Sequence, residues 1–375
     1  MCTGIQIITD DMSAVQMNDI LKKGGKVYFS LSKDTSIKEP LIIEKPVEIA
    51  GNNITGRLIS QGCETFIIRS SYVTIKNMQI VGDKDYSIIL DGDESHDNDI
   101  QNRHVYNTYI ENIVLGLGGI EIRDSNAFFI NKVYQAKEYN AAGKGLYIHS
   151  VSKDKFKGNL DGVLSNFSMG GAAVEIKGFN DGLKLYNFNI ERSNSTKGAV
   201  YIHDTSHTST MYLENVSGCR DASHNGFNFE NAANILLNNS YYEDNCVGHG
   251  YTMSKCTNIT FNNCGVVGSQ VGYFCNASKN IIFRDCYSHN NSDVDFYIYA
   301  KSGNCSDIKY YNCSAYNTPV DYMLTYSKYG FFFTHENPHK YEGIVLRDCR
   351  TTGHGDPEYA FSNPGAVLCD NFRTS

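Results

Sequence analysis

Residues 261–288 read FNNCGVVGSQVGYFCNASKNIIFRDCYS and contain one four-residue pattern twice, as FNNC at 261–264 and FRDC at 283–286. In both copies a polar residue, Asn or Asp, stands directly before Cys. The pattern returns as YYNC at 310–313 and LRDC at 346–349, so it recurs every 22 to 36 residues. Recurrence at this interval is typical of repeat proteins, in which one structural unit stacks on the next.

The two positions before and at the Cys can be followed far upstream. The polar position holds Asn77, Asn112, Lys132, Asn166, Asn187, Asn215, Asn239, Asn263, Asp285, Asn312 and Asp348. The position after it holds Met78, Ile113, Val133, Phe167, Phe188, Val216, Ser240, Cys264, Cys286, Cys313 and Cys349. Two short alternating strands precede each polar position, as in GYFC at 272–275 and NIIF at 280–283.

Strands this short cannot bury an apolar face alone, so we expect them to stack as coils of a parallel β-solenoid, about 4.8 Å apart. Equivalent positions would then form columns. Stacked Asn side chains can hydrogen-bond to one another and to the turn backbone. The cysteines would lie inside as small apolar residues. The chain contains 12 Cys and no sign of an export signal, which favours reduced thiols over a disulfide framework.

These columns resemble the right-handed parallel β-helix of the pectate-lyase-like superfamily, whose coils carry an Asn ladder at a tight turn. The resemblance covers about residues 38–350 and implies an all-β chain of about twelve coils. The opening TDDMSAVQ, at 9–16, is similar to that of phage tail-spike and other polysaccharide-degrading β-helix proteins. The expected organisation is an N-terminal cap over 1–37, the β-helix over 38–350, and a C-terminal cap or tail over 351–375.

The N-terminal cap contains a predicted amphipathic helix within residues 9–25. Thr9 to Asp11 offer N-caps, and Gly24 and Gly25 would end the helix. The apolar stripe expected to face the core is Val15, Ile20 and Leu21.

Charge and hydropathy exclude two classes of partner. The net charge is −8 and the isoelectric point about 5.8, so no basic stripe for nucleic acid is expected. No apolar run approaches the roughly 18 residues of a membrane span. The N-terminus has neither the basic nor the apolar region of a signal peptide. We therefore expect cytoplasmic synthesis, followed by virion association or release outside the cell.

The candidate site lies on strands that mostly begin with Gly, whose alternate residues face outward. From the coil of residue 121 to that of residue 230, two outward columns carry Glu121, Arg123, Tyr147, His149, Glu175, Lys177, Tyr201, His203, Asn228 and Glu230. The resemblance implies that a substrate groove runs along this face. Segments 92–107 and 150–162 leave the same coils and are candidates for its walls.

The candidate catalytic residues are the three glutamates and two histidines of these columns. Glu121 and Glu175 stand two coils apart, about 9–10 Å along the stack, so their side chains could reach the roughly 6.5–9.5 Å separation of an inverting glycosidase. Glu175 and Glu230 offer a similar diagonal pair. His149 and His203 can titrate near neutral pH and act as acid or base.

The candidate substrate-binding residues are the aromatic, cationic and amide members of the columns. Tyr147 and Tyr201 can stack on sugar rings, and Asn228 can hydrogen-bond to them. Arg123 and Lys177 can hold a uronic-acid carboxylate and so favour removal of the α-proton, the first step of β-elimination.

Hydrolysis of an extended polysaccharide is the favoured interpretation. β-Elimination and non-catalytic glycan binding, as in a tail-spike or adhesin module, are the alternatives. The same charges also fit cross-strand pairs on an ordinary solvated sheet.

No cofactor or metal is expected. The weaker alternatives are Ca²⁺ at the acidic run 91–99 and a metal between His335 and His339. Resemblance to tail-spike proteins also suggests a homotrimer.

Overall fold

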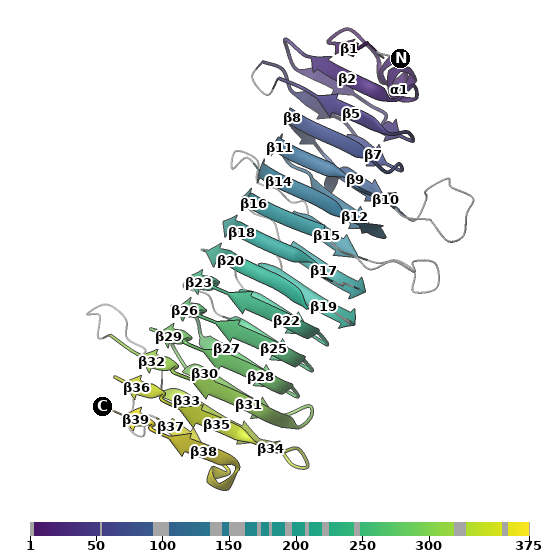
Figure 1. The fold of residues 1–375 in the computed structure, drawn as a ribbon. Coiled ribbons are helices and arrows are strands. Elements are labelled where there is room, and N and C mark those ends of the chain that lie inside the picture. The colour runs from purple at the N-terminus through teal and green to yellow at the C-terminus, as the bar shows by residue number, and fades with distance from the viewer. Residues whose placement is uncertain are drawn as a thin grey trace. The chain divides into compact units, whose positions relative to one another are not determined.

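The computed structural model describes residues 4–52, 55–92, 105–135, 145–149, 162–170, 174–179, 182–191, 197–206, 210–219, 225–243, 248–318, 328–354 and 359–374. The fold is a parallel β-solenoid of about 12 turns, with 63% of residues in strands and 4% helical. The expected all-β fold is therefore confirmed. The chain divides into two compact units, Met1–Glu191 and Arg192–Ser375, and Figure 1 shows the successive strands of each.

In the first unit, two rows of parallel strands carry most of the solenoid. One row is β4 (Leu41–Ile43), β7 (Phe66–Ile68), β9 (Tyr86–Asp91), β12 (Gly119–Arg123), β15 (Leu146–His149) and β17 (Val174–Phe179). The other is β1 (Gln6–Thr9), β2 (Gly25–Ser30), β5 (Val47–Ala50), β8 (Val73–Gly82), β11 (Tyr109–Leu115), β14 (Phe128–Gln135), β16 (Gly162–Gly170) and β18 (Lys184–Glu191).

In the second unit, three rows are distinct. The first is β19 (Val200–Ser206), β21 (Phe227–Glu230), β24 (His249–Ser254), β27 (Val271–Asn276), β30 (Val294–Ala300), β33 (Tyr329–His335) and β37 (Tyr359–Phe361). The second is β20 (Met211–Cys219), β22 (Ala233–Asn238), β25 (Thr257–Asn262), β28 (Lys279–Arg284), β31 (Cys305–Tyr311), β35 (Ile344–Arg347) and β38 (Val367–Asp370). The third is β23 (Tyr241–Glu243), β26 (Gly265–Val267), β29 (Tyr287–His289), β32 (Ser314–Tyr316), β36 (Arg350–Thr352) and β39 (Arg373–Thr374).

The polar column predicted from the sequence marks a tight turn that recurs in eleven places from Asn77 to Asp348. All eleven of its positions, Lys132 included, have positive φ angles between 50° and 56°. Asn and Asp tolerate this left-handed conformation better than other residues with a Cβ. Their side chains also form the expected ladder, for example from Asn263 Nδ2 to Asn239 Oδ1 at 2.8 Å. The backbone conformation and the ladder together explain why Asn recurs there.

The cysteines of the following column lie in the core, as expected. Cys264, Cys286, Cys313 and Cys349 are buried free thiols. Each donates to backbone carbonyls nearby, as Cys286 Sγ does to Phe261 O at 3.6 Å. Among the described residues, Cys63, Cys256, Cys275 and Cys305 are also free and buried, and Cys369 is free and exposed. Reduced thiols are thus confirmed for these nine positions.

The capping helix differs from its prediction in two details. Helix α1 spans Ala14–Leu21 and its N-cap is Ser13, in a capping box with Gln16, rather than Thr9 to Asp11. Asp10 instead accepts hydrogen bonds from the loop that follows β2, including one from Ser32 N at 3.0 Å.

The buried stripe of α1 agrees with its prediction at Leu21 but includes Met17 in place of Val15. Met17 and Leu21, four residues apart and therefore on one helix face, are buried, whereas Val15 is 56% exposed. Ile20 is half-buried. Gly24 and Gly25 have positive φ angles and follow the helix as expected.

Parallel pairing extends past both expected boundaries of the β-helix. In the first unit β1 pairs with β2 and β2 with β5, so pairing begins before residue 38. In the second unit β38 and β39 continue it beyond residue 350. Within the described part of the chain, no helix is both long and apolar enough to cross a membrane.

Candidate functional site

The first-unit candidates lie in two outward rows, because β9, β12, β15 and β17 pair in register. One row reads Ile89, Glu121, Tyr147 and Glu175, and the other reads Asp91, Arg123, His149 and Lys177. The predicted alignment of these strands is confirmed. The rows place Tyr147 and His149 on the coil between the two glutamates.

Glu121 is the centre of this group, and it is buried rather than exposed. The residue is 4% exposed, and both carboxylate oxygens are engaged. Oε2 accepts a hydrogen bond from Arg123 Nη2 at 2.7 Å, and Oε1 lies 2.8 Å from His149 Nε2. The sequence indicates that Glu121 faces away from the core, but long side chains on the same and the next coil shield it from water.

Hydrogen bonds from two neighbouring side chains keep Glu121 ionised. Burial raises the pKa of its carboxyl, but the hydrogen bonds from His149 and Arg123 outweigh this effect and the pKa is lowered. An ionised carboxylate accepts hydrogen bonds only, so His149 Nε2 must carry the proton. In neutral His149 the lone pair therefore lies on Nδ1, which makes that atom the available base.

Two tyrosines border His149 and Glu121. The Tyr147 ring stacks on the imidazole of His149 with centroids 4.1 Å apart. Burial raises the pKa of Tyr147 to about 12, and Glu175 and Glu121 add to this rise, so its hydroxyl stays protonated. The Tyr86 ring stacks on Tyr147 at 6.5 Å. Its buried hydroxyl has no hydrogen-bond partner among the described residues, and sequence reasoning missed it.

Asp91 supports Arg123 from the preceding coil. Its side chain is 3% exposed and lies 3.2 Å from Arg69 Nε and 3.8 Å from Arg123 Nη1. Asp91 belongs to the acidic run 91–99 considered for Ca²⁺, but most of that run is outside the described residues.

The described residues contain no group of three or more His, Cys, Asp or Glu side chains that could hold a metal. His335, considered with His339 for a metal site, has its Nδ1 3.1 Å from Ser362 Oγ.

The second-unit candidates form a separate, internally paired group. Tyr201 Oη donates to Glu230 Oε2 at 2.8 Å, and the Tyr201 ring stacks on His203 with centroids 4.2 Å apart. His203 Nδ1 lies 3.0 Å from Asp204 Oδ2. Asn228 Nδ2 donates to Lys197 O at 2.9 Å. Tyr201, His203 and Asn228 are all buried.

Two features of the predicted groove stay predictions. The diagonal pair Glu175 and Glu230 takes one residue from each unit. The predicted walls, 92–107 and 150–162, lie largely outside the described residues.

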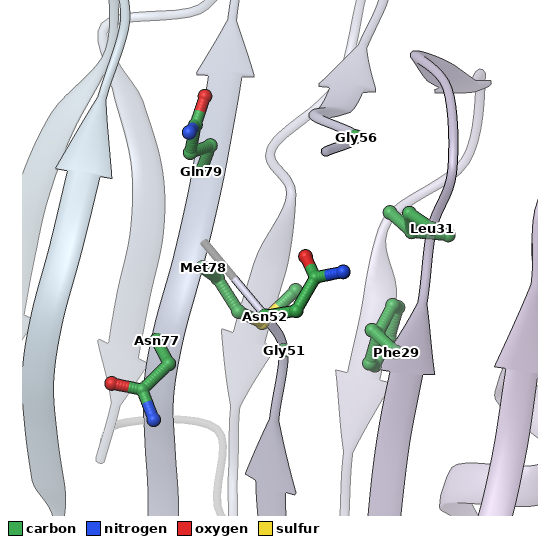
Figure 2. A pocket seen from close by; sticks show the side chains of 8 residues that line it. All are labelled: Phe29, Leu31, Gly51, Asn52, Gly56, Asn77, Met78 and Gln79. Atoms are coloured by element: carbon green, nitrogen blue, oxygen red, sulfur yellow. The ribbon is translucent and has the colours of Figure 1, made fainter. Parts of the chain in front are cut away.

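A pocket in the first unit lies elsewhere and lacks catalytic groups. Figure 2 shows its lining of Phe29, Leu31, Gly51, Asn52, Gly56, Asn77, Met78 and Gln79. Met78 points toward Gly51, where a Cβ would come within 2.9 Å of the Met78 side chain. The lining contains no charged side chain, so this pocket offers no acid, base or nucleophile.

No protein-family model matches the sequence, and no curated protein matches it. The fold is similar to that of solved parallel β-helix proteins. A GH87 α-1,3-glucanase catalytic domain in complex with nigerose superimposes with a TM-score of 0.57 at 12% identity, over 90% of this chain and 68% of the other. A mannuronic acid-specific polysaccharide family 6 lyase from human gut microbiota superimposes with a TM-score of 0.54 at 10% identity. That match covers 99% of this chain and 91% of the lyase chain.

A third similar structure is tailspike protein 3 of bacteriophage CBA120. It superimposes with a TM-score of 0.52 at 10% identity. The match covers 98% of this chain and 59% of the tailspike chain. The right-handed parallel β-helix expected from the sequence is thus shared with these proteins. At such identities the likeness shows the fold alone.

Proposed function

We propose that this protein cleaves an acidic polysaccharide by β-elimination on the outward face of β12, β15 and β17. The observation that carries the proposal is the contact of His149 Nε2 with buried Glu121 at 2.8 Å, which leaves His149 Nδ1 as a base. A base held in one tautomer by a buried carboxylate is a recurring catalytic arrangement. The similar α-1,3-glucanase and polysaccharide lyase support a polysaccharide as the ligand class.

The neighbouring side chains supply the other parts of an elimination. Lys177 is exposed and directly follows His149 in register, where it can neutralise a uronate carboxylate. His149 Nδ1 then removes the proton on the carbon next to that carboxylate. The electron pair forms a carbon–carbon double bond as the glycosidic C–O bond breaks. Tyr147, whose hydroxyl stays protonated, donates a proton to the leaving oxygen.

Hydrolysis by a carboxylate pair is supported less well by this site. An inverting pair needs one carboxylic acid with a raised pKa, whereas the pKa of Glu121 is lowered. Both of its oxygens are also occupied. Hydrolysis would therefore need Glu175 or Glu230 as the acid.

A specific observation favours non-catalytic glycan binding as the second candidate. Glu121 and Glu230 are each bonded to neighbouring side chains of their own unit. A surface whose polar side chains are already hydrogen-bonded to one another can bind a sugar without catalysing a reaction.

The direct test is the rate of polyuronate cleavage, followed by the ultraviolet absorbance of the new double bond. His149→Ala should lower kcat by roughly 10²–10⁴-fold, the usual contribution of a general base. His339→Ala, at a histidine outside the site, is the matched control and should leave kcat unchanged. Full activity of His149→Ala would exclude the proposed base.

Three further expectations accompany this proposal. The step uses side chains alone, so a chelator should leave the rate unchanged. A homotrimer, suggested by the resemblance to tail-spike proteins, is tested by light scattering during size-exclusion chromatography. Virion association or release outside the cell is tested by locating the protein with an antibody.

A further inference from the structure

We propose that the second unit carries a separate binding surface for an acidic glycan, on the outward face of β23, β29, β32, β36 and β39. Its residues are Tyr241, Tyr287, His289, Tyr316, Arg350 and Arg373, hereafter the Tyr–Arg face. The inference rests on the proposed function only for the choice of a glycan as ligand. The face shares no residue with the proposed cleavage site.

Register places these side chains in two outward rows. One row runs Tyr241, Gly265, Tyr287, Ser314, Arg350 and Arg373. The other runs Glu243, Val267, His289, Tyr316 and Thr352. The residues between the rows, such as Tyr242 and Ser288, are fully buried. The two rows therefore make up the outer surface of this part of the solenoid.

Gly265 leaves room for the ring of Tyr287 in the first row. A Cβ at Gly265 would lie 2.1 Å from Cζ of Tyr287, so the Tyr287 ring covers this glycine and extends toward Tyr241. Burial raises the pKa of Tyr287, and Tyr316, Tyr241 and Glu243 add to the rise, which is consistent with their closeness. Tyr241 itself is 42% exposed.

The second row adds a stacked pair of rings. The rings of His289 and Tyr316 stack with centroids 4.3 Å apart and an interplanar angle of 12°. His289 Nδ1 is buried and has no hydrogen-bond partner within the described parts of the chain. The stack therefore holds His289 by ring contact, and both residues are half-exposed. Aromatic faces with polar edges suit the apolar faces and hydroxyl rims of sugar rings.

The end of the first row carries unbalanced positive charge. Arg350 and Arg373 are directly opposite each other on neighbouring coils, and both are exposed. Like charges in this position destabilise a sheet. Neither guanidinium forms an ion pair with any described residue, and Arg373 Nε donates only to Asn371 Oδ1 at 3.2 Å. An anionic ligand would relieve the repulsion, and guanidinium groups bind carboxylates with two parallel hydrogen bonds.

Together these features favour an acidic saccharide over a protein partner. The outward rows hold only one aliphatic side chain, Val267, so they lack the apolar centre typical of protein interfaces. A uronate polymer could lie along the rows, with sugar rings on Tyr241, Tyr287 and Tyr316 and carboxylates at the two arginines.

The test is affinity for soluble polymannuronate, with a neutral glucan as the comparison polymer, by gel retardation at two salt concentrations. The variants are the double substitutions Tyr241→Ala/Tyr316→Ala and Arg350→Ala/Arg373→Ala. Tyr212→Ala and Arg347→Ala, exposed residues on another row of the same unit, are the matched controls. We expect the double tyrosine substitution to lower the affinity for polymannuronate roughly 5- to 50-fold. The double arginine substitution should lower this affinity by about 10-fold or more and weaken its salt dependence.

Wild-type affinity in both double variants would overturn the inference, as would a wild-type protein that does not bind polymannuronate or that binds only the neutral glucan. Binding is measured in the wild type and in His149→Ala. If His149→Ala still cleaves the polymer, the proposed function fails, whereas loss of affinity in the Tyr–Arg variants would still support this face. If His149→Ala is inactive and the variants bind normally, only the present inference fails.

Discussion

At the scale of single residues, Glu121 combines burial with ion pairing. Its position removes a carboxylate from water, which is unfavourable, and hydrogen bonds from Arg123 and His149 compensate for this change. The net effect is a lowered pKa. Such a residue can fix the tautomer and orientation of His149 without reacting itself.

This lowered pKa predicts a pH dependence of stability. The unfolded chain should protonate Glu121 near its ordinary value of 4.5, and the folded chain only at a lower pH. The stabilisation from ionised Glu121 is thus present above pH 4.5 and is lost as the pH falls through the lower, folded-state pKa. Urea unfolding as a function of pH should show that Glu121→Gln loses this part of the acid dependence. Glu39→Gln, at an exposed carboxylate, should retain it, and identical profiles for wild type and Glu121→Gln would contradict the account.

Tyr147 gives a second test at this scale. Tyr147→Phe retains the ring that stacks on His149 but removes the hydroxyl proton assigned to the leaving group. We expect kcat on a polyuronate to fall by roughly 10²–10⁴-fold, with a much smaller change in KM. A fall in affinity with unchanged kcat would make Tyr147 a binding residue instead.

At the scale of elements, a fully buried pair of hydrogen-bonded side chains joins the strand β30 to the residues that follow β36 in the second unit. His354 Nε2 lies 2.6 Å from Asp295 Oδ2, and both side chains are inaccessible to water. Ser288 Oγ on β29 donates to the other oxygen at 2.9 Å. Burial raises the pKa of Asp295, and the bonds from His354, Asn291 and Ser288 oppose this rise.

Removal of one partner from such a pair leaves an uncompensated buried group. Asp295→Ala should lower the free energy of unfolding by about 3–5 kcal/mol. Asp370→Ala, which breaks the exposed ion pair with Arg347, should cost about 0–1 kcal/mol. Denaturant titration of both variants measures the difference, and equal effects would show that burial does not control the strength of these pairs.

The coil elements also show what the sequence could reveal. The polar residue that recurs before Cys264, Cys286, Cys313 and Cys349 predicted the coils, their register and the buried thiols. It did so because the turn of each of these coils has the same left-handed backbone conformation. A second ladder, from Asn280 to Asn258 and from Asn258 to Asn234, was missed because it recurs over few coils.

The site was less predictable than the coils. The alternation of residues along a strand indicates which side chains face outward, but it does not indicate which of them a neighbouring side chain will cover. Glu121, Tyr201 and Asn228 are therefore buried despite their outward direction. Tyr86 was missed because its contact with Tyr147 depends on ring packing between separate coils.

At the scale of the whole molecule, each unit has its own polar surface. The first unit carries the Glu121, Tyr147 and His149 group, and the second carries the Tyr–Arg face. Each surface has its own proposed role, polysaccharide cleavage for the first and glycan binding for the second. We therefore expect substitutions in the first surface to lower turnover and substitutions in the Tyr–Arg face to lower affinity.

The most direct test of the central claim is mass spectrometry of oligosaccharides released by the wild-type protein from polyuronates and neutral glucans. Cleavage by β-elimination should release fragments of the polyuronate with unsaturated ends, formed without the addition of water. Fragments that have gained water would show hydrolysis and contradict the role given to His149. Intact polymers throughout would contradict cleavage altogether, and intact polymers that nevertheless bind the protein would support glycan binding.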